Sequence, residues 1–243
     1  MSIKAVIFDL DNTLTHRDLS IQVFAGRLFE HYKSQIINAD QSSYEQILRI
    51  IRYIDNGGYP KLERLTIPTI GGSVADQLIK QLTWSLTPSL DELTAFWFDQ
   101  FGLNAVAMPD AENVLNKLKN FGLKLAVISN GGHATRLKIL EGLGFKDFFD
   151  EIVSSESAGI SKPNAEIFLK TCEKLNVHPN KCLYVGDHPI NDYFGAKQAG
   201  LNAIFLEGFH LPVEDQFPPI EDTIQSLPQI LDFINSSEKF SNY

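Results

Sequence analysis

The chain has 243 residues, of which 44% are hydrophobic and 21% are charged. This composition is typical of a folded protein with one large domain or two smaller ones, and it excludes an intrinsically disordered chain. The net charge of -9 at pH 7 excludes a general attraction to nucleic acids or anionic membranes, so we expect neither as a partner.

The two cysteines, Cys172 and Cys182, are too few for the disulfide framework of a small secreted protein, so we expect free thiols in a reducing compartment. The first residues show neither a signal-peptide pattern nor a membrane span. Both observations indicate a cytoplasmic protein, and nothing in the sequence points to an obligate protein partner.

The first predicted strand is the apolar run at residues 5–8, which ends at Asp9 and is typical of a strand buried on both faces. Similar apolar runs, each followed by polar residues, predict further strands at residues 125–128, 183–185 and 203–206. Helical periodicity lies between these runs, at residues 111–121, 133–143, 164–175 and 192–199. This alternation predicts an α/β fold with a doubly wound parallel sheet, in which ligands bind beyond the carboxyl ends of the strands.

Residues 17–106 interrupt the alternation and contain no pattern of a buried strand. Helical periodicity recurs there at residues 21–32, 44–54, 74–82 and 90–101, and the glycines and prolines of residues 56–72 predict a long loop. We therefore expect a core domain of residues 1–16 and 107–243 and a smaller all-helical cap domain of residues 17–106, joined near His16 and Pro109. The polar tail after Phe233 is expected to fray.

Two carboxylates, Asp9 and Asp11, follow the first strand two residues apart. Both can face one site if the chain leaves the sheet there, although such a pair is also typical of a solvated turn. Residues 129–132, Ser-Asn-Gly-Gly, follow the next predicted strand and offer a hydroxyl and backbone N–H groups before a helix. That arrangement is typical of an anion-binding cradle and equally of a plain glycine turn.

Lys162 precedes Pro163 at the predicted start of a helix, where it can be aimed at the site or lie on a surface loop. Residues 186–192, Gly-Asp-His-Pro-Ile-Asn-Asp, then follow the third predicted strand. Their spacing lets Asp187 reach a metal while Asp192 supports it. Each motif alone is ambiguous, but their order and their common position at strand ends agree.

These four motifs resemble, in the right order, the motifs of the haloacid dehalogenase superfamily: DLDNT at residues 9–13, SN at 129–130, KP at 162–163 and GDHPIND at 186–192. The resemblance runs from Lys4 to about Leu206, apart from the insertion. It implies a Rossmann-like core. The position of the insertion after the first motif resembles the helical cap of the subgroup with phosphoglycolate phosphatase, beta-phosphoglucomutase and several nucleotidases.

The resemblance implies that Asp9 attacks phosphorus and forms an aspartyl-phosphate, which splits one difficult displacement into two easier ones. It implies that Asp11 protonates the leaving oxygen and then activates water, and that Thr13 holds the loop. Halide displacement and phosphonate cleavage do without an acid at the position of Asp11. This residue therefore favours a phosphatase over either of those activities.

The resemblance also implies that Ser129 and the Asn130 amide bind phosphoryl oxygens, while Lys162 neutralises charge on the transferring group. Mg²⁺ is the implied cofactor, in the shell of oxygen ligands that it prefers. The aspartates implied at the metal are Asp9 and Asp187 through their side chains, Asp11 through its backbone carbonyl, and Asp192 in support. His16 and Arg17, a basic pair at the start of the insertion, are expected substrate contacts.

The sequence therefore predicts a magnesium-dependent phosphomonoester hydrolase for a small phosphorylated metabolite, either a nucleoside monophosphate or a sugar phosphate. There are three alternatives, of which a binding protein on a catalytically silent core is disfavoured by the intact acids. A phosphomutase of the beta-phosphoglucomutase type has the same core motifs. A phospho-accepting signalling domain also combines acids, a hydroxyl and a lysine around magnesium, but it carries the acceptor two strands after the acid pair and has no helical insertion.

Overall fold

The computed structural model describes residues 2–210 and 218–239. The chain divides into two compact units. One consists of Met1–Thr15 and Ala107–Tyr243 and is called the core unit below, and the other consists of His16–Val106 and is called the helical unit. The sequence places the boundary after residue 16, and the structure places it after Thr15.

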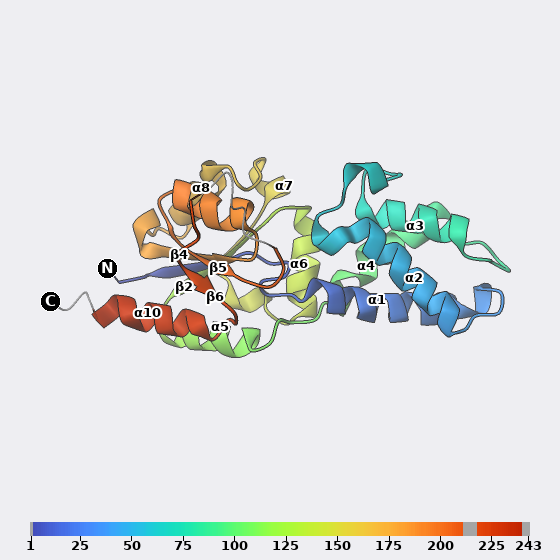
Figure 1. Ribbon diagram of the computed structural model, residues 1–243, viewed down its shortest axis with the longest axis horizontal. Coiled ribbons are helices and arrows are strands. Elements are labelled where there is room, and N and C mark those ends of the chain that lie inside the picture. The colour runs from blue at the N-terminus through green and yellow to red at the C-terminus, as the bar shows by residue number, and fades with distance from the viewer. Residues whose placement is uncertain (1, 211–217, 240–243) are drawn as a thin grey trace. The chain divides into compact units, whose positions relative to one another are not determined.

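The core unit contains a parallel six-stranded sheet, in the order β3-β2-β1-β4-β5-β6 over the described residues (Figure 1). In chain order the strands are β1 (Ala5–Phe8), β2 (Lys124–Ser129), β3 (Glu151–Ser154), β4 (Cys182–Gly186), β5 (Asn202–Leu206) and β6 (Thr223–Ile224). The strand order reverses between β1 and β4, where Ala5 pairs with Cys182. In a sheet of this kind the ligand site lies beyond the carboxyl ends of the strands at that reversal.

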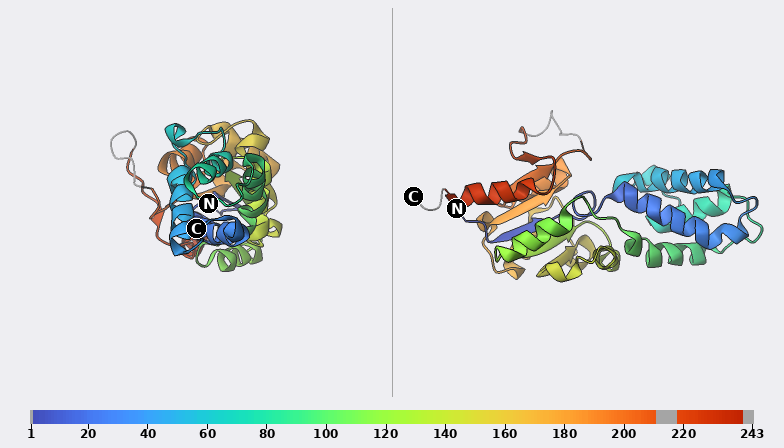
Figure 2. Two further views of the ribbon diagram at one scale, coloured as in Figure 1. Left: turned by 90° about the vertical axis from the view of Figure 1, so that its right-hand side faces the viewer. Right: turned by 90° about the horizontal axis from the view of Figure 1, so that it is seen from below.

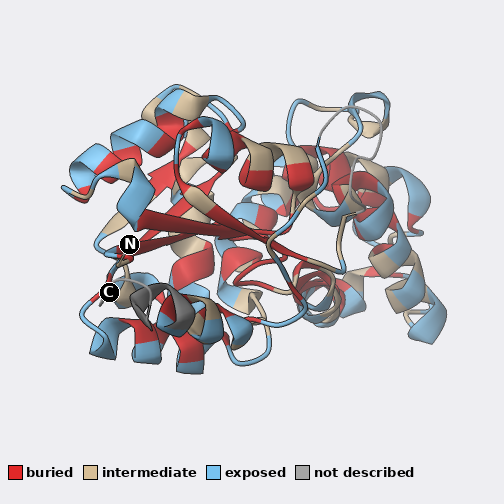
Figure 3. Cartoon of the chain, turned by 60° about the vertical axis from the view of Figure 1, so that its left-hand side comes forward, coloured by how far each residue is buried: buried red, intermediate tan, exposed pale blue. Residues whose placement is uncertain are grey.

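Helices cover both faces of the sheet, and this explains why its central strands are apolar throughout. On one face Ile167 and Phe168 of α8 (Ala165–Lys174) pack with Ala5 and Ile7 of β1. On the other face lie α5 (Ala111–Asn120) and α10 (Gln229–Lys239), as Figures 1 and 2 show. The strands between these layers are buried (Figure 3). The remaining helices of the core unit are α6 (His133–Gly142), α7 (Ser155–Ala158) and α9 (Gly195–Gln198).

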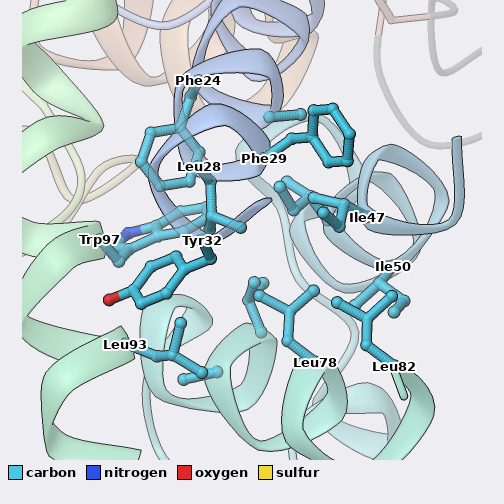
Figure 4. Packing of buried hydrophobic residues seen from close by; sticks show 14 of the residues in the cluster. Phe24, Leu28, Phe29, Tyr32, Ile47, Ile50, Leu78, Leu82, Leu93 and Trp97 are labelled. Atoms are coloured by element: carbon cyan, nitrogen blue, oxygen red, sulfur yellow. The ribbon is translucent and has the colours of Figure 1, made fainter. Parts of the chain in front are cut away.

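The helical unit has a hydrophobic core of its own. Its main helices are α1 (Arg17–Tyr32), α2 (Gln41–Asp55), α3 (Ile70–Gln81) and α4 (Leu90–Gln100), which lie side by side (Figure 2). Side chains spaced four positions apart lie on one face of each helix, as do Phe24 and Leu28 of α1 and Leu93 and Trp97 of α4. These faces meet in a common hydrophobic cluster (Figure 4). In residues 2–210 and 218–239 no helix has the length and apolarity needed to cross a membrane.

Two edge strands and two helices differ from the sequence prediction. The pattern does not predict β3 and β6 because both are short, partly exposed strands toward the edges of the sheet and lack a continuous apolar run. Helix α3 begins at Ile70, inside the predicted loop of residues 56–72, because the Thr69 side chain accepts a hydrogen bond from the Gly72 N–H and caps the helix. Helix α10 continues to Lys239, where the tail was expected to fray.

Candidate active site

The loop after β1 brings the two predicted acids to the carboxyl edge of the sheet. Asp9 and Asp11 are both buried, at 3% and 9% exposure. The chain turns sharply there, since the Leu10 carbonyl accepts hydrogen bonds from three successive backbone N–H groups further on, at 3.4, 2.9 and 2.9 Å. Asn12 lies inside this turn with φ of 60°, a left-handed conformation that asparagine tolerates better than most residues.

Thr13 ties the β1 loop to the loop after β4. Its hydroxyl is fully buried and donates to Asp187 Oδ1 at 3.4 Å. Asp187 follows β4 directly and is itself fully buried. Two loops that are 174 residues apart in the chain are thereby joined at the reversal of strand order.

Lys162 connects three buried polar groups. Its ammonium group donates to Asp9 Oδ1 and to Asp192 Oδ1 at 2.6 Å each, and to the Tyr184 hydroxyl at 2.9 Å. Burial disfavours the charged amine, but the carboxylates of Asp192 and Asp9 outweigh it and raise the pKa of Lys162. The lysine is therefore a fixed positive charge beside Asp9.

The residues after β2 meet the Lys162 segment through Asn130. The Asn130 side chain accepts from the Lys162 backbone N–H at 2.9 Å and donates to the Lys162 carbonyl at 3.1 Å. Both polar groups of this side chain therefore hold Lys162 in place. Ser129, the last residue of β2, is 2% exposed and lies at the same edge of the sheet.

Asp9, Asp187 and Asp192 each offer one carboxylate oxygen to a common site, and these three oxygens lie within 4.8 Å of one another. Asp192 uses both oxygens inside the protein, one toward Lys162 and one as acceptor of the His188 backbone N–H at 3.0 Å. Oδ2 of Asp9 and Oδ2 of Asp187, by contrast, are buried and accept no hydrogen bond, although His210 Nε2 lies 3.4 Å from Oδ2 of Asp187. A buried oxygen without a donor is costly, and a divalent cation that prefers oxygen ligands relieves that cost. The donor set therefore fits magnesium.

The electrostatics of the metal-free protein agree with this fit. Burial raises the pKa of Asp9 to about 7, against the opposing charge of Lys162. Burial, with the charge of Asp9 and then of Asp192, raises the pKa of Asp187 to about 9. A cation bound between them favours the ionised carboxylates.

The loop after β4 is ordered by a histidine and a glycine. His188 Nδ1 accepts hydrogen bonds from the backbone N–H groups of Ile190 and Asn191 at 3.1 Å each. A Cβ atom on Gly186 would lie 2.5 Å from the Asp192 side chain. Glycine is therefore required at position 186 for Asp192 to reach Lys162.

Arg136 is a residue of this site that the sequence motifs do not indicate. It lies in α6, and its Nη1 donates to Asp11 Oδ2 at 2.5 Å. Tyr184, an apolar position in the predicted strand pattern, likewise turns out to hold Lys162. A single arginine on a helix and a tyrosine in a buried strand have many structural uses, so neither gives a signal in the sequence.

His16 and Arg17, the two expected substrate contacts, lie at the start of the helical unit. His16 caps α1 by accepting the Leu19 N–H at 3.4 Å. Arg17 is 5% exposed, and its guanidinium pairs with buried Asp55 at 2.5 and 3.2 Å and lies over the Phe101 ring. These contacts lie inside the helical unit, and the substrate contacts expected at His16 and Arg17 stay a prediction.

Residues 3–200 match the haloacid dehalogenase-like hydrolases. The chain belongs to this family. It is therefore an enzyme of a hydrolase superfamily. Because it belongs to this family, the alternative of a phospho-accepting signalling domain is excluded. The resemblance drawn from the four motifs and the expected α/β fold are confirmed.

Two relatives of this hydrolase align over most of its length. It is 27% identical over 241 residues to the glyceraldehyde 3-phosphate phosphatase of Methanocaldococcus jannaschii, which covers 98% of this chain and 99% of the relative. It is 28% identical over 210 residues to the phosphoglycolate phosphatase of Psychrobacter arcticus, which covers 85% of this chain and 84% of the relative. Both relatives are named phosphatases.

Two solved structures share the fold. One is the HAD-hydrolase YfnB of Bacillus subtilis, bound to magnesium, with a TM-score of 0.67, 20% identity and coverage of 97% of this chain and 100% of that chain. The other is the L-2-haloacid dehalogenase of Xanthobacter autotrophicus, with a TM-score of 0.66, 20% identity and coverage of 96% and 98%. Since a dehalogenase is as similar in fold, the fold does not distinguish between the two reactions, and only the side chains of the site can.

Proposed function

We propose that this hydrolase is a magnesium-dependent phosphomonoester hydrolase that acts on a small phosphorylated metabolite through an aspartyl-phosphate at Asp9. One observation carries the proposal. Oδ1 of Asp9 is held by Lys162, while Oδ2 is buried and has no hydrogen-bond partner. Lys162 at Oδ1 and a divalent cation at Oδ2 can thus fix the carboxylate of Asp9 in one orientation, which suits it to attack phosphorus.

In the first step an oxygen of Asp9 bonds to phosphorus, and the bond from phosphorus to the leaving oxygen breaks. Lys162 stands beside Asp9 and offsets negative charge on the transferring group. Ser129 and the amide of Asn130 are proposed to bind phosphoryl oxygens at the end of β2. Asn130 also fixes the backbone of Lys162 at 2.9 and 3.1 Å, so it contributes to the position of the lysine.

Asp11 is proposed to act twice. It gives a proton to the leaving oxygen in the first step, and it takes a proton from water when water attacks the aspartyl-phosphate in the second. Asp11 is 9% exposed and lies two residues after Asp9 in the same sharp turn. An acid at this place favours the release of an alkoxide over the release of a halide.

Magnesium, when bound, supplies positive charge that favours the ionised form of Asp9 and attracts the substrate phosphate. Asp9 and Asp187 would hold it through their side chains and Asp11 through its backbone carbonyl. Asp192 is proposed to act through Lys162 and the loop after β4, because both of its oxygens are engaged there.

The relatives favour one side of the predicted substrate range. Their names specify glyceraldehyde 3-phosphate and phosphoglycolate, both short phosphorylated compounds, and neither name specifies a nucleotide. We therefore propose a short-chain sugar phosphate or phosphorylated acid as the substrate class. No observation favours the phosphomutase alternative.

A screen of purified protein tests the proposal. The panel contains glyceraldehyde 3-phosphate, phosphoglycolate, hexose phosphates and nucleoside monophosphates, and phosphate release is measured with magnesium and with a chelator. We expect release that requires magnesium and that has its highest kcat/KM on a short-chain ester. Absence of release from every ester, or full activity in the chelator, would refute the proposal.

A further inference from the structure

The four sequence motifs leave unexplained a partly buried ion pair between Asp11 and Arg136. Nη1 of Arg136 and Oδ2 of Asp11 are 2.5 Å apart, and the two side chains are 11% and 12% exposed. Asp11 Oδ1 accepts a hydrogen bond from the Thr15 hydroxyl at 3.4 Å. The carboxylate of Asp11 is therefore held at both oxygens, by groups on different elements.

The backbone around Arg136 is built to admit this contact. Gly131 has φ of 136°, a conformation that side chains rarely allow, and a Cβ atom there would lie 2.3 Å from Nη2 of Arg136. The backbone N–H of Arg136 donates to the Gly132 carbonyl at 3.1 Å in the first turn of α6. Only glycine at position 131 leaves room for the guanidinium, so the loop that ends with Ser129 and Asn130 also determines where Arg136 lies.

We infer that Arg136 is a positioning residue, which holds the carboxylate of Asp11 in the orientation required to activate water against the aspartyl-phosphate. The inference rests on the proposed function. In this step the water oxygen bonds to phosphorus, the bond from phosphorus to Asp9 breaks with its electron pair returning to the Asp9 carboxylate, and a water proton passes to Asp11. Orientation of the base limits such a step, because small displacements of a catalytic group cost large factors in rate.

The second step can be separated from the first with 4-nitrophenyl phosphate. Its leaving group departs without needing a proton, so kcat/KM for this ester reports attack by Asp9 and is insensitive to the orientation of Asp11. Decay of the phosphorylated enzyme reports the water step alone. A residue that acts only through Asp11 should change the rate at which the phosphorylated enzyme decays and leave kcat/KM unchanged.

The test compares wild type with Arg136→Gln and Arg136→Lys. Enzyme phosphorylated by 4-nitrophenyl phosphate in magnesium is diluted into substrate-free buffer, quenched with acid at intervals and assayed for phosphate on Asp9. We expect decay to slow by roughly tenfold to a hundredfold in Arg136→Gln, a part of the general-base effect. Decay in Arg136→Lys should be intermediate, because the charge is kept and the planar fork is lost. In both variants kcat/KM should stay within about threefold of wild type.

Two comparisons show whether Arg136 acts through Asp11. In the background of Asp11→Asn, Arg136→Gln should slow decay no further. The matched control is Lys119→Gln, which removes the cation of an exposed ion pair with Asp150 at 3.3 Å in the same unit and should leave decay unchanged.

Decay at the wild-type rate in Arg136→Lys and in any folded Arg136→Gln would overturn the inference. The inference would also be overturned if Arg136→Gln lowered the decay rate and kcat/KM by equal factors, or if it slowed decay further in the background of Asp11→Asn. In either case Arg136 would act on the substrate or on the fold and not through Asp11. These outcomes leave the proposed function intact. Wild-type enzyme that never carries phosphate on Asp9 would refute the proposed function itself.

Discussion

Lys162 balances carboxylates that would otherwise repel one another. It reaches Asp9 and Asp192 at 2.6 Å each. Burial, followed by the charges of Asp9 and Asp192, raises the pKa of Asp187 to about 9, whereas the charge and hydrogen bond of Lys162 limit the rise in the pKa of Asp9 to about 7. Without a metal, the folded protein therefore keeps protons on groups that are ionised in the unfolded chain.

This difference predicts how stability depends on pH. Both acids have an ordinary value of 3.8 and a higher pKa in the folded metal-free protein, so the folded state binds more protons over that interval. Their contribution to the stability of the folded protein is fully present below the ordinary pKa and is lost as pH rises through the pKa values of the folded state. We expect the Tm of chelator-treated protein to fall between about pH 6.5 and pH 9, above the range in which the lowered pKa of His188, at about 4, has the opposite effect, and magnesium to raise the Tm most at the upper end.

Asp187→Asn is the control for that titration, because it keeps the shape of the side chain and removes one of the two titrating groups. Its Tm should fall less over the same interval and should respond weakly to magnesium. A Tm of the metal-free wild type that rises steadily with pH would contradict the assigned pKa shifts.

At the scale of single residues, the sequence predicts the site acids better than the groups that orient them. Asp9, Asp11 and Asp187 were identifiable because the carboxyl ends of parallel strands converge, which an apolar run followed by an acid already indicates. The contact of Arg136 with Asp11 depends on the position of α6 and on the space at Gly131, and neither follows from sequence spacing.

Arg17 has a structural partner that the sequence does not indicate. A basic residue beside the nucleophile loop predicts a substrate contact, which stays a prediction, and the structure adds an ion pair with Asp55, which lies 38 residues away at the end of α2. Both side chains are buried, at 5% and 0%. No periodicity of the sequence relates the two residues, so only the packing of α1 against α2 reveals the pair.

At the scale of elements, α3 and α4 approach closely at one glycine. A Cβ atom on Gly71 would lie 2.5 Å from Cδ1 of Trp97. The Trp97 ring stacks on Phe101 at 4.6 Å between centroids and meets Phe24 edge-on at 5.0 Å, so it has little room to move. The glycines that predict a loop from composition are therefore packing residues in the first turn of a helix.

Gly71→Ala should destabilise the protein by about 1–3 kcal/mol, the usual cost of overpacking a core. The measurement is the midpoint of urea unfolding. Gly26→Ala in α1 is the matched control, because its Cβ would meet Tyr44 at an ordinary 4.0 Å. That variant should be neutral or more stable by about 0.5–1 kcal/mol, as alanine favours a helix. Equal effects of the two substitutions would contradict the packing described for Trp97.

The same scale shows the limit of strand prediction. The central strands carry helices on both faces and read as continuous apolar runs, so four of them follow from sequence. The edge strands β3 and β6 have exposed or half-buried positions and depend on their neighbours for pairing, as Val153 does with Ile128 and Ile224 with Leu206. Such strands are determined by the sheet more than by their own residues.

In the whole molecule, two backbone links join the core unit to the helical unit, and the residues of one link pair with those of the other. Thr15 pairs with Ala107 in an antiparallel bridge of the core unit, and within the helical unit the His16 N–H donates to the Val106 carbonyl at 2.8 Å. Each unit also has a hydrophobic cluster of its own. The helical unit can therefore be replaced by a short linker without separating strands of the sheet.

We propose that the helical unit selects the substrate, since it is inserted directly after the nucleophile loop. Replacement of residues 17–106 by a short flexible linker should leave weak activity on 4-nitrophenyl phosphate, because Asp9, Lys162 and Asp187 all belong to the core unit. Discrimination among metabolites should be lost. The check is the ratio of kcat/KM values for the best metabolite and the aryl ester, and an unchanged ratio would assign selectivity to the core loops.

Phosphoryl transfer to Asp9 can be tested by an acid-quenched reaction with a good substrate in magnesium, followed by digestion and mass spectrometry. We expect a base-labile phosphate on the peptide that contains Asp9. Asp9→Asn, which keeps the shape and removes the nucleophilic charge, should fold normally, carry no phosphate and be slower by several orders of magnitude. Phosphate release by Asp9→Asn at a near-normal rate, with no phosphate on Asp9 in the wild type, would rule out phosphoryl transfer to Asp9.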